Sequence, residues 1–228
     1  MESVENVLAK ITETYASCPF YRDKGFSTMS FDRADGSAEV LQRTQQFVTL
    51  FRRPSRFLFA SSSANGSVIA KGIVWRGEKV LLKMRSREVE EGPAIDIVIA
   101  AGEAPIPKLL FGQQAFVSNW PANRCRLLPE MVIHETHCVG IELPRFMDCQ
   151  TTVWFESRTW LVRRLIEQHF SPFVTSSIST LVGEDQPYFA TQTHEYLEVE
   201  ITNETKDELF GLESLQDGLE QLTRPVQK

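Results

Sequence analysis

The sequence contains no apolar run that reaches the roughly 18 residues needed to cross a membrane as a helix. Its first ten residues are charged and helix-like, which is unlike a secretory signal peptide. We therefore expect a protein without a transmembrane segment. The expected location is the cytoplasm, or the periplasm or cell envelope if a leader has been removed.

Positive charge is also scarce in the sequence. The 228 residues include 24 lysines and arginines against 30 acidic residues, which gives a formal net charge of −6 at pH 7. Nucleic-acid-binding domains usually carry a basic stripe. The local groups Arg52, Arg53 and Arg56, and Arg163 with Arg164, fall in strand-like runs whose exposed faces often carry charge. We expect no nucleic-acid partner.

Cysteine is rare, and no pair of cysteines forms a CxxC motif. The four residues are Cys18, Cys125, Cys138 and Cys149, and four cysteines allow three complete pairings. We predict buried free thiols. A disulfide among Cys125, Cys138 and Cys149 is expected only if the protein is exported.

The usual catalytic motifs are missing. The sequence has no GxSxG, GxGxxG or phosphate-binding loop. Its adjacent acidic pairs, such as Glu90 with Glu91, are expected to be solvated, whereas acid–base catalysis needs a positioned pair. We predict no catalytic residue and no cofactor.

A metal site is not expected either. The run His134-Glu135-Thr136-His137 lacks the i, i+4 histidine spacing of a zinc-binding helix. On a strand, His134 and His137 would point to opposite faces. A thiolate site formed by His137, Cys138 and Cys149 has no supporting second motif.

An amphipathic helix is predicted at the N-terminus. Ser3 is a suitable N-cap, and Val4, Val7, Leu8, Ile11 and Tyr15 follow at helical spacing. The helix is expected to end near Ser17, because Pro19 disfavours a helical conformation at Cys18.

After this helix the hydrophobic period changes to two. Strands are predicted at Lys24–Phe31, Thr44–Phe51, Arg56–Ser61, Val68–Arg76 and Lys79–Met84. Asp35-Gly36, Asn65-Gly66 and Gly77-Glu78 are turn signals. The last four of these strands therefore predict an antiparallel meander.

The remainder of the chain adds short helices and further strands. Short helices are predicted at Ala94–Ala101 and from Pro107 to Phe111, lying against the sheet. Further predicted elements are strands at Met131–Leu143, Gln150–Glu156, Trp160–His169 and Tyr188–Ile201, and a helical tail at Asp207–Leu222. Because strand twist curls a large sheet, we predict a mainly β (α+β) fold in one domain, residues 1–228: a curved antiparallel half-barrel of about 9–11 strands covered by short helices.

The run TQQFVTLFRRPSRFLFA, residues 44–60, resembles the F-x-x-x-F-x-R-P-x-x-F-x-F hairpin of the LolA/LolB-like superfamily. The matching residues are Phe47, Phe51, Arg53, Pro54, Phe57 and Phe59. The run TTVWFESRTWLVRRLIEQ resembles a second element of that superfamily, x-x-W-x-D-x-x-T-x-L-x-R-R. The order of the surrounding segments is also similar, so the resemblance extends from about Val4 to Phe210.

This resemblance implies a half-barrel whose apolar concave face is covered by helices and accepts acyl chains. The function it implies is non-catalytic binding of a lipid, an acylated protein or another amphiphile, as a carrier or chaperone, with peripheral contact to a membrane compatible with that role. The implied lining is Phe47, Phe51, Phe57, Phe59, Ile73 and Trp75 from the sheet, with Ile97, Leu109, Leu110 and Phe111 from the helices.

Alternatives stay open at this stage. The same apolar residues are also expected if they simply form a packed core. Arg53 has two expected roles besides that of a surface residue: it bonds backbone carbonyls of the covering helices, or it contacts a ligand head group. The rival functions are a cell-envelope protein-interaction or sensor module without a small ligand, and an uncharacterised hydrolase.

Overall fold

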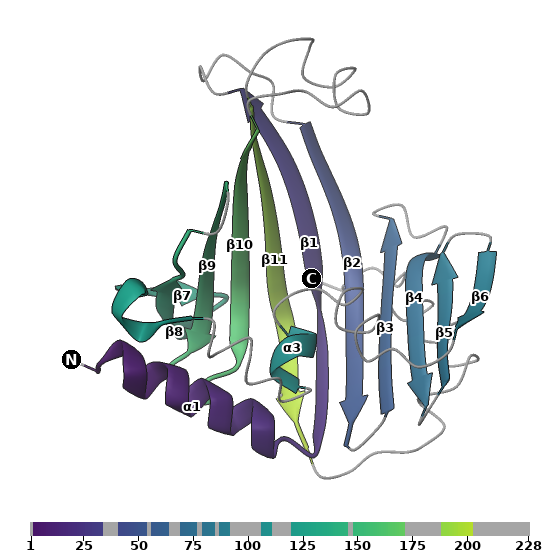
Figure 1. Ribbon diagram of the computed structural model, residues 1–228, viewed down its shortest axis with the longest axis horizontal. Coiled ribbons are helices and arrows are strands. Elements are labelled where there is room, and N and C mark those ends of the chain that lie inside the picture. The colour runs from purple at the N-terminus through teal and green to yellow at the C-terminus, as the bar shows by residue number, and fades with distance from the viewer. Residues whose placement is uncertain are drawn as a thin grey trace.

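One antiparallel sheet of eleven strands dominates the computed structural model of the protein (Figure 1). The structure describes residues 2–33, 41–53, 56–63, 69–76, 79–84, 87–91, 106–110, 120–145, 148–171 and 188–202. The strands are β1 (Phe20–Arg33), β2 (Leu41–Arg52), β3 (Arg56–Ser63), β4 (Ile69–Arg76), β5 (Lys79–Met84), β6 (Arg87–Glu91), β7 (Arg126–Ile133), β8 (Thr136–Glu142), β9 (Cys149–Glu156), β10 (Val162–Ser171) and β11 (Tyr188–Ile201).

The strand order is β6-β5-β4-β3-β2-β1-β11-β10-β9-β8-β7. Two meanders therefore meet at the centre, where the first strand pairs with the last from Tyr21↔Ile201 to Arg33↔Tyr188. The sheet is open, with β6 and β7 at its edges, and it curves (Figure 1). The prediction of a curved antiparallel half-barrel of 9–11 strands is confirmed.

Helix α1 (Val4–Ser17) forms as the sequence predicts. The Ser3 hydroxyl accepts a hydrogen bond from the Asn6 amide at 3.3 Å, which caps the first turn. The buried stripe Val7, Leu8, Ile11 and Tyr15 follows the helical period. The helix ends at Cys18, which adopts the extended conformation expected before a proline.

Two helices cover one face of the sheet, which we call the inner face. Helix α1 runs across one end of the strands (Figure 1), and the short α3 (Ile106–Leu110) contacts α1. Their apolar side chains share one buried cluster with inner-face residues of β1, β2, β3, β8, β9, β10 and β11. Neither helix is long and apolar enough to span a membrane, and this holds for every helix in the described part of the chain.

The strand register shows which side chains share the inner face. Tyr21 pairs with Phe51, which pairs with Phe57. Because side chains alternate between faces, the inner face of β1 also carries Asp23, Gly25, Ser27, Met29 and Phe31, and the other strands follow in register.

One strand prediction was wrong, and one strand was missed. Residues 131–143 do not form one strand: they belong to the hairpin β7–β8, whose turn is made by His134 and Glu135 with φ of 46° and 64°. Strand β6 was not predicted at all. The backbone of the short run Arg87–Glu91 pairs with β5 from Val80↔Glu91 to Met84↔Arg87. Because this run is mostly charged, its sequence does not indicate a strand.

Other predicted boundaries differ by a few residues. Strand β1 begins at Phe20, earlier than predicted, and α3 begins at Ile106. The turn signals Asp35-Gly36, Asn65-Gly66 and Gly77-Glu78 lie outside the described residues, as do the predicted helices at Ala94–Ala101 and Asp207–Leu222.

Candidate functional site on the inner face

Four phenylalanines predicted to line the site converge on the inner face. Phe47, Phe51, Phe57 and Phe59 come from β2 and β3, and each has an exposed fraction of 0%. The rings of Phe47 and Phe59 stack with their centroids 6.4 Å apart. All four belong to the cluster that includes Leu109 and Leu110 of α3. In this closed arrangement the two helices shield the phenylalanines from water.

Of the other predicted lining residues, the structure describes the backbone positions of Ile73 and Trp75. The backbone register sets Ile73 opposite Phe59 and Trp75 opposite Phe57, on the strand next to β3. Ile97 and Phe111 lie outside the described residues.

Arg53 connects the end of β2 to both helices. Its Nε donates to the Cys18 carbonyl at 2.9 Å, and its Nη2 donates to the carbonyls of Tyr15 at 2.9 Å and Leu110 at 2.8 Å. These oxygens lie at the C-terminal ends of α1 and α3, where carbonyls have no partner within the helix. Of the expected roles of Arg53, the structure shows hydrogen bonding to the covering helices.

Tyr15 provides a second link between α1 and the sheet. The Val162 amide at the start of β10 donates to the Tyr15 hydroxyl at 2.9 Å, and both residues are completely buried. Burial raises the pKa of Tyr15 well above its usual value, although the Val162 hydrogen bond opposes this effect. Tyr15 therefore acts as a neutral, buried acceptor.

The inner face also contains buried polar groups that were not predicted from the sequence. The Tyr21 hydroxyl donates to the Asp23 carboxylate at 2.7 Å, and both residues have exposed fractions of 0%. Burial raises the pKa of Tyr21 well above its usual value, and the Asp23 charge adds to this effect. Burial also lowers the pKa of His194 to about 4.

An apolar cleft of about 690 Å³ opens at the β7 edge of the sheet. Leu127 and Val139, on β7 and β8, contribute to its wall, and Trp160 contributes from the segment between β9 and β10. Leu127 and Trp160 also pack against the buried cluster. The remaining lining residues are Glu2, Leu128, Pro129, Glu130 and Ser157.

Trp160 has an unusual backbone conformation at this cleft. Its φ of 61° lies in the left-handed region, which non-glycine residues seldom adopt. The Lys10 Nζ of α1 lies 4.7 Å from the centre of its ring. The sequence alone does not indicate the cleft, because its walls come from the N-terminus, β7, β8 and Trp160, which are far apart along the chain.

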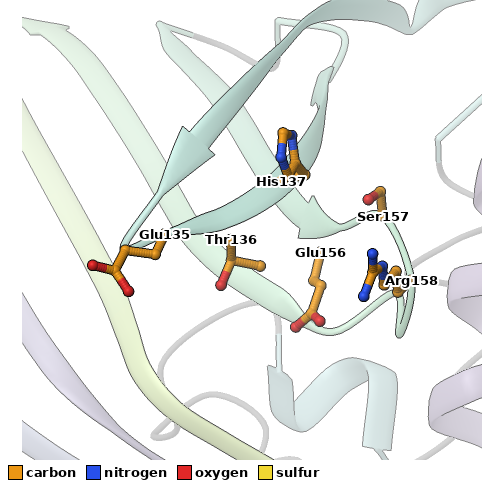
Figure 2. Close-up of a pocket in the computed structure, with 6 residues that line it drawn as sticks. All are labelled: Glu135, Thr136, His137, Glu156, Ser157 and Arg158. Atoms are coloured by element: carbon orange, nitrogen blue, oxygen red, sulfur yellow. The ribbon is translucent and has the colours of Figure 1, made fainter.

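A smaller polar notch of about 220 Å³ lies beside the cleft, between the β7–β8 and β9–β10 turns (Figure 2). It is lined by Glu135, Thr136, His137, Glu156, Ser157 and Arg158. The Glu156 carboxylate accepts from Arg163 Nε at 3.0 Å, so this carboxylate is engaged in an ion pair.

The histidines of the β7–β8 hairpin have separate surroundings. His137 lines the notch, whereas His134 Nε2 lies 3.4 Å from a carboxylate oxygen of Glu195 on β11. Within the described ranges, no three His, Cys, Asp or Glu side chains are arranged to hold a metal ion.

All four cysteines are free in this structure. Burial raises the pKa of the Cys18 thiol to about 11, although the nearby Arg53 opposes the effect. Burial also raises the pKa of Cys125, Cys138 and Cys149. Thiols with raised pKa values are poor nucleophiles at neutral pH.

No protein-family profile matches the sequence, and no curated protein sequence is similar to it. Solved structures do match. A LolA superfamily protein from Nitrosomonas europaea is 10% identical, with a TM-score of 0.38, and the match covers 94% of this chain and 100% of that one. An uncharacterized conserved protein from Thermus thermophilus is 12% identical, with a TM-score of 0.46, over 100% of this chain and 96% of that one.

The lipoprotein LppX of Mycobacterium tuberculosis also matches, at 9% identity and a TM-score of 0.38, over 87% of this chain and 99% of that one. Identities this low concern the fold and leave the activity open.

Proposed function

We propose that the protein binds an amphiphile, such as a lipid or an acylated protein, with the apolar part of the ligand on the inner face beneath α1 and α3. It acts as a carrier or chaperone and not as an enzyme. The proposed location is the cell envelope, which the sequence resemblance to LolA/LolB-like proteins supports.

The apolar cleft at the β7 edge is the observation that carries the proposal. Its volume of about 690 Å³ falls in the range typical of small-molecule sites. Two of its walls, Leu127 and Trp160, pack against the same cluster that contains the inner-face phenylalanines. The cleft therefore adjoins the apolar interior.

Burial of an acyl chain supplies the driving force. Each buried CH₂ contributes about 0.8 kcal/mol, so a twelve-carbon chain contributes on the order of 9 kcal/mol before the entropic cost of binding. Part of this energy is used to move α1 and α3 away from the phenylalanines. Because Arg53 hydrogen-bonds both helices, its contacts set how much energy that movement requires.

The first test uses 12-bromododecanoic acid, whose bromine quenches nearby tryptophan fluorescence. We expect saturable quenching of the full chain, and weaker quenching in Trp160→Phe because Trp160 lines the cleft. Leu127→Glu places a carboxylate in the cleft wall, and we expect it to weaken binding on the order of tenfold or more.

Val132→Glu is the matched control, because Val132 lies on the same strand but is 57% exposed. This variant is expected to bind the probe as the parent protein does. If Leu127→Glu and Val132→Glu bind the probe equally well, the cleft is not part of the binding site.

Native mass spectrometry of protein purified without detergent tests the proposal independently. A co-purifying lipid or acylated species supports a carrier and defines the ligand class. A mass of the free chain that stays unchanged after incubation with fatty acids and phospholipids contradicts it. That result favours the protein-interaction module, with the aromatic residues serving only as core.

A further inference from the structure

Lys10 of α1 places an ammonium group at the apolar cleft. Its Nζ lies 4.7 Å from the centre of the Trp160 ring and forms an ion pair with the Glu2 carboxylate. Trp160 and Glu2 both line the cleft. An aromatic ring face and a carboxylate each attract an ammonium group. Two of the cleft's own residues therefore hold a cation that the protein itself supplies.

The contacts of Lys10 are weak enough to be exchanged. The side chains of Lys10 and Glu2 are 41% and 45% exposed. Exposed ion pairs contribute little to stability, because water and salt compete with them. A second ammonium group that enters the cleft can therefore take the place of Lys10, whose side chain then returns to solvent.

A β-bulge brings a second carboxylate to the cleft. Two residues of β7, Pro129 and Glu130, lie opposite the single residue Val139 of β8. Bulges re-aim side chains and occur often beside functional sites, and all three residues line the cleft. Glu130 is exposed and has no ion-pair partner in the described part of the chain. Its carboxylate is therefore available to a ligand.

Basic residues beside the cleft have acidic neighbours of their own. Arg126, at the start of β7, forms an ion pair with Glu142. Arg158 lines the neighbouring notch, as does Glu135. No basic residue of the described ranges lines the cleft itself, whose charged residues are both acidic.

Resting on the function proposed above, we infer that the cleft binds the head group of the amphiphile and that this head group is a primary ammonium. The ammonium lies on the Trp160 ring in place of Lys10, with the Glu2 and Glu130 carboxylates as its partners. The alkyl chain attached to it packs on the apolar walls of the cleft, which adjoin the buried cluster.

An anionic head group fits the cleft less well. To gain a cationic partner, it would have to separate Lys10 from Glu2, and it would then lie beside two carboxylates. The net charge of −6 adds to this repulsion.

The test compares three probes that carry twelve-carbon chains, each below its micelle concentration at neutral pH: dodecylammonium, dodecanoate and dodecyl maltoside. Isothermal titration calorimetry on the full chain gives the affinities. We expect dodecylammonium to bind on the order of tenfold more tightly than either of the other probes. Equal or tighter binding of dodecanoate or dodecyl maltoside overturns the inference.

Lys10→Met removes the internal competitor. We expect this variant to bind dodecylammonium about fivefold more tightly than the parent does, and not to bind dodecanoate more tightly. The matched control is Lys24→Met, because Lys24 also forms a partly exposed ion pair, with Glu198, but lies on the central strand β1. If Lys10→Met binds dodecylammonium no more tightly than Lys24→Met does, the ligand does not replace Lys10.

Glu130→Gln removes the second carboxylate with little change of shape. We expect it to weaken dodecylammonium binding on the order of tenfold and to leave dodecyl maltoside binding unchanged. Glu200→Gln, at an exposed carboxylate on β11, makes the same change of net charge away from the cleft and is expected to bind both probes as the parent does. Equal affinities of the two variants for dodecylammonium contradict a role of Glu130.

Butylammonium separates an amine-headed lipid from a lysine side chain of a partner polypeptide. It carries the ammonium and the four carbons of a lysine side chain but no long chain. Because each buried CH₂ adds to affinity, we expect it to bind at least about a hundredfold more weakly than dodecylammonium. Equal binding of the two amines would overturn the inference, since the site would then recognise lysine side chains.

The outcomes separate this inference from the proposed function. If the three twelve-carbon probes bind equally and Glu130→Gln changes none of the affinities, the cleft does not recognise an ammonium, and amphiphile binding stands. If none of them binds, the proposed function fails and this inference fails with it. Urea unfolding of each variant identifies any loss of binding that comes from loss of the fold.

Discussion

The Arg53 guanidinium donates a hydrogen bond to the Leu110 carbonyl at 2.8 Å, which ties the residue after β2 to the last residue of α3. The same side chain reaches two carbonyls at the end of α1. A single charged group therefore holds both covering helices against the sheet.

Replacing Arg53 is expected to loosen both helices. Arg53→Ala removes three hydrogen bonds from a charged donor, so we expect a loss of stability on the order of 2–3 kcal/mol. Backbone amides of α1 and α3 should exchange faster with deuterium, and a hydrophobic dye should bind more strongly. Arg53→Lys keeps the charge but cannot span three carbonyls, and should give an intermediate result.

The control for this prediction is Arg126→Ala. Arg126 forms an ion pair with Glu142 but is 69% exposed, and exposed pairs contribute little to stability. If Arg53→Ala matches Arg126→Ala in urea unfolding and in hydrogen exchange, Arg53 does not hold the helices.

Tyr15→Phe is expected to destabilise the protein while preserving the aromatic ring in the core. The substitution removes the acceptor of the Val162 amide and leaves that N–H buried, at a cost of about 1–3 kcal/mol. Urea unfolding measures the loss. Ser17→Ala serves as a control, because its hydroxyl donates to the Glu13 carbonyl at the exposed side of α1. If Tyr15→Phe and Ser17→Ala unfold at the same urea concentration, the hydrogen bond between Val162 and the Tyr15 hydroxyl does not stabilise the fold.

The fold was largely predictable because its signals are local. Ser3 and Pro19 set the limits of α1, and alternating aromatics define β2 and β3. The turn at His134 and Glu135 was missed because both residues adopt positive φ without glycine, and the usual turn signal depends on glycine or asparagine.

The site was only partly predictable because it depends on distant contacts. The spacing of Phe47, Phe51, Phe57 and Phe59 predicts one shared face, and the register confirms it. The burial of Asp23 could not be foreseen, since an aspartate in a strand normally faces solvent. Its contact with the Tyr21 hydroxyl is local, two residues along the same strand, but its complete burial appears only in the folded protein.

Gly25 is expected to tolerate no side chain. A Cβ atom there would lie 1.9 Å from the Glu195 carbonyl oxygen and 2.8 Å from the Phe47 ring. Because a neighbouring strand's backbone cannot move without breaking the β1–β11 pairing, Gly25→Ala should lower the free energy of unfolding by at least about 2 kcal/mol. Chemical denaturation gives this value.

Gly140 provides the comparison, because the atoms near its Cβ position belong to a side chain. The nearest is in the Trp154 ring, at 2.5 Å. Gly140→Ala should therefore be destabilising alone and partly rescued by Trp154→Leu. Gly25→Ala should show no such rescue with Phe47→Leu, since its worst clash is with backbone. If Phe47→Leu rescues Gly25→Ala, the backbones of β1 and β11 can move apart enough to relieve the clash with the Glu195 carbonyl.

His194 should make the protein less stable in mild acid. It is 1% exposed and lies edge-on to Phe47, with ring centroids 6.3 Å apart. Burial lowers its pKa from the usual 6.5 to about 4. The unfolded chain therefore binds a proton below about pH 6.5 that the folded protein does not bind. The contribution of neutral His194 to the free energy of unfolding is fully present above pH 6.5. It decreases as the pH falls toward 4, by a total on the order of 3 kcal/mol.

Urea unfolding of the parent and of His194→Gln between pH 7.5 and 4.5 measures this contribution. Other groups titrate in both proteins, so the difference between the two curves isolates His194, whose cross-strand neighbours Leu165 and Ser27 are uncharged. We expect the variant to lose less stability than the parent over this range. His137→Gln, at an exposed histidine, should follow the parent. Parallel curves for the parent and His194→Gln would mean that the buried imidazole takes up its proton without loss of folding energy, which its burial does not allow.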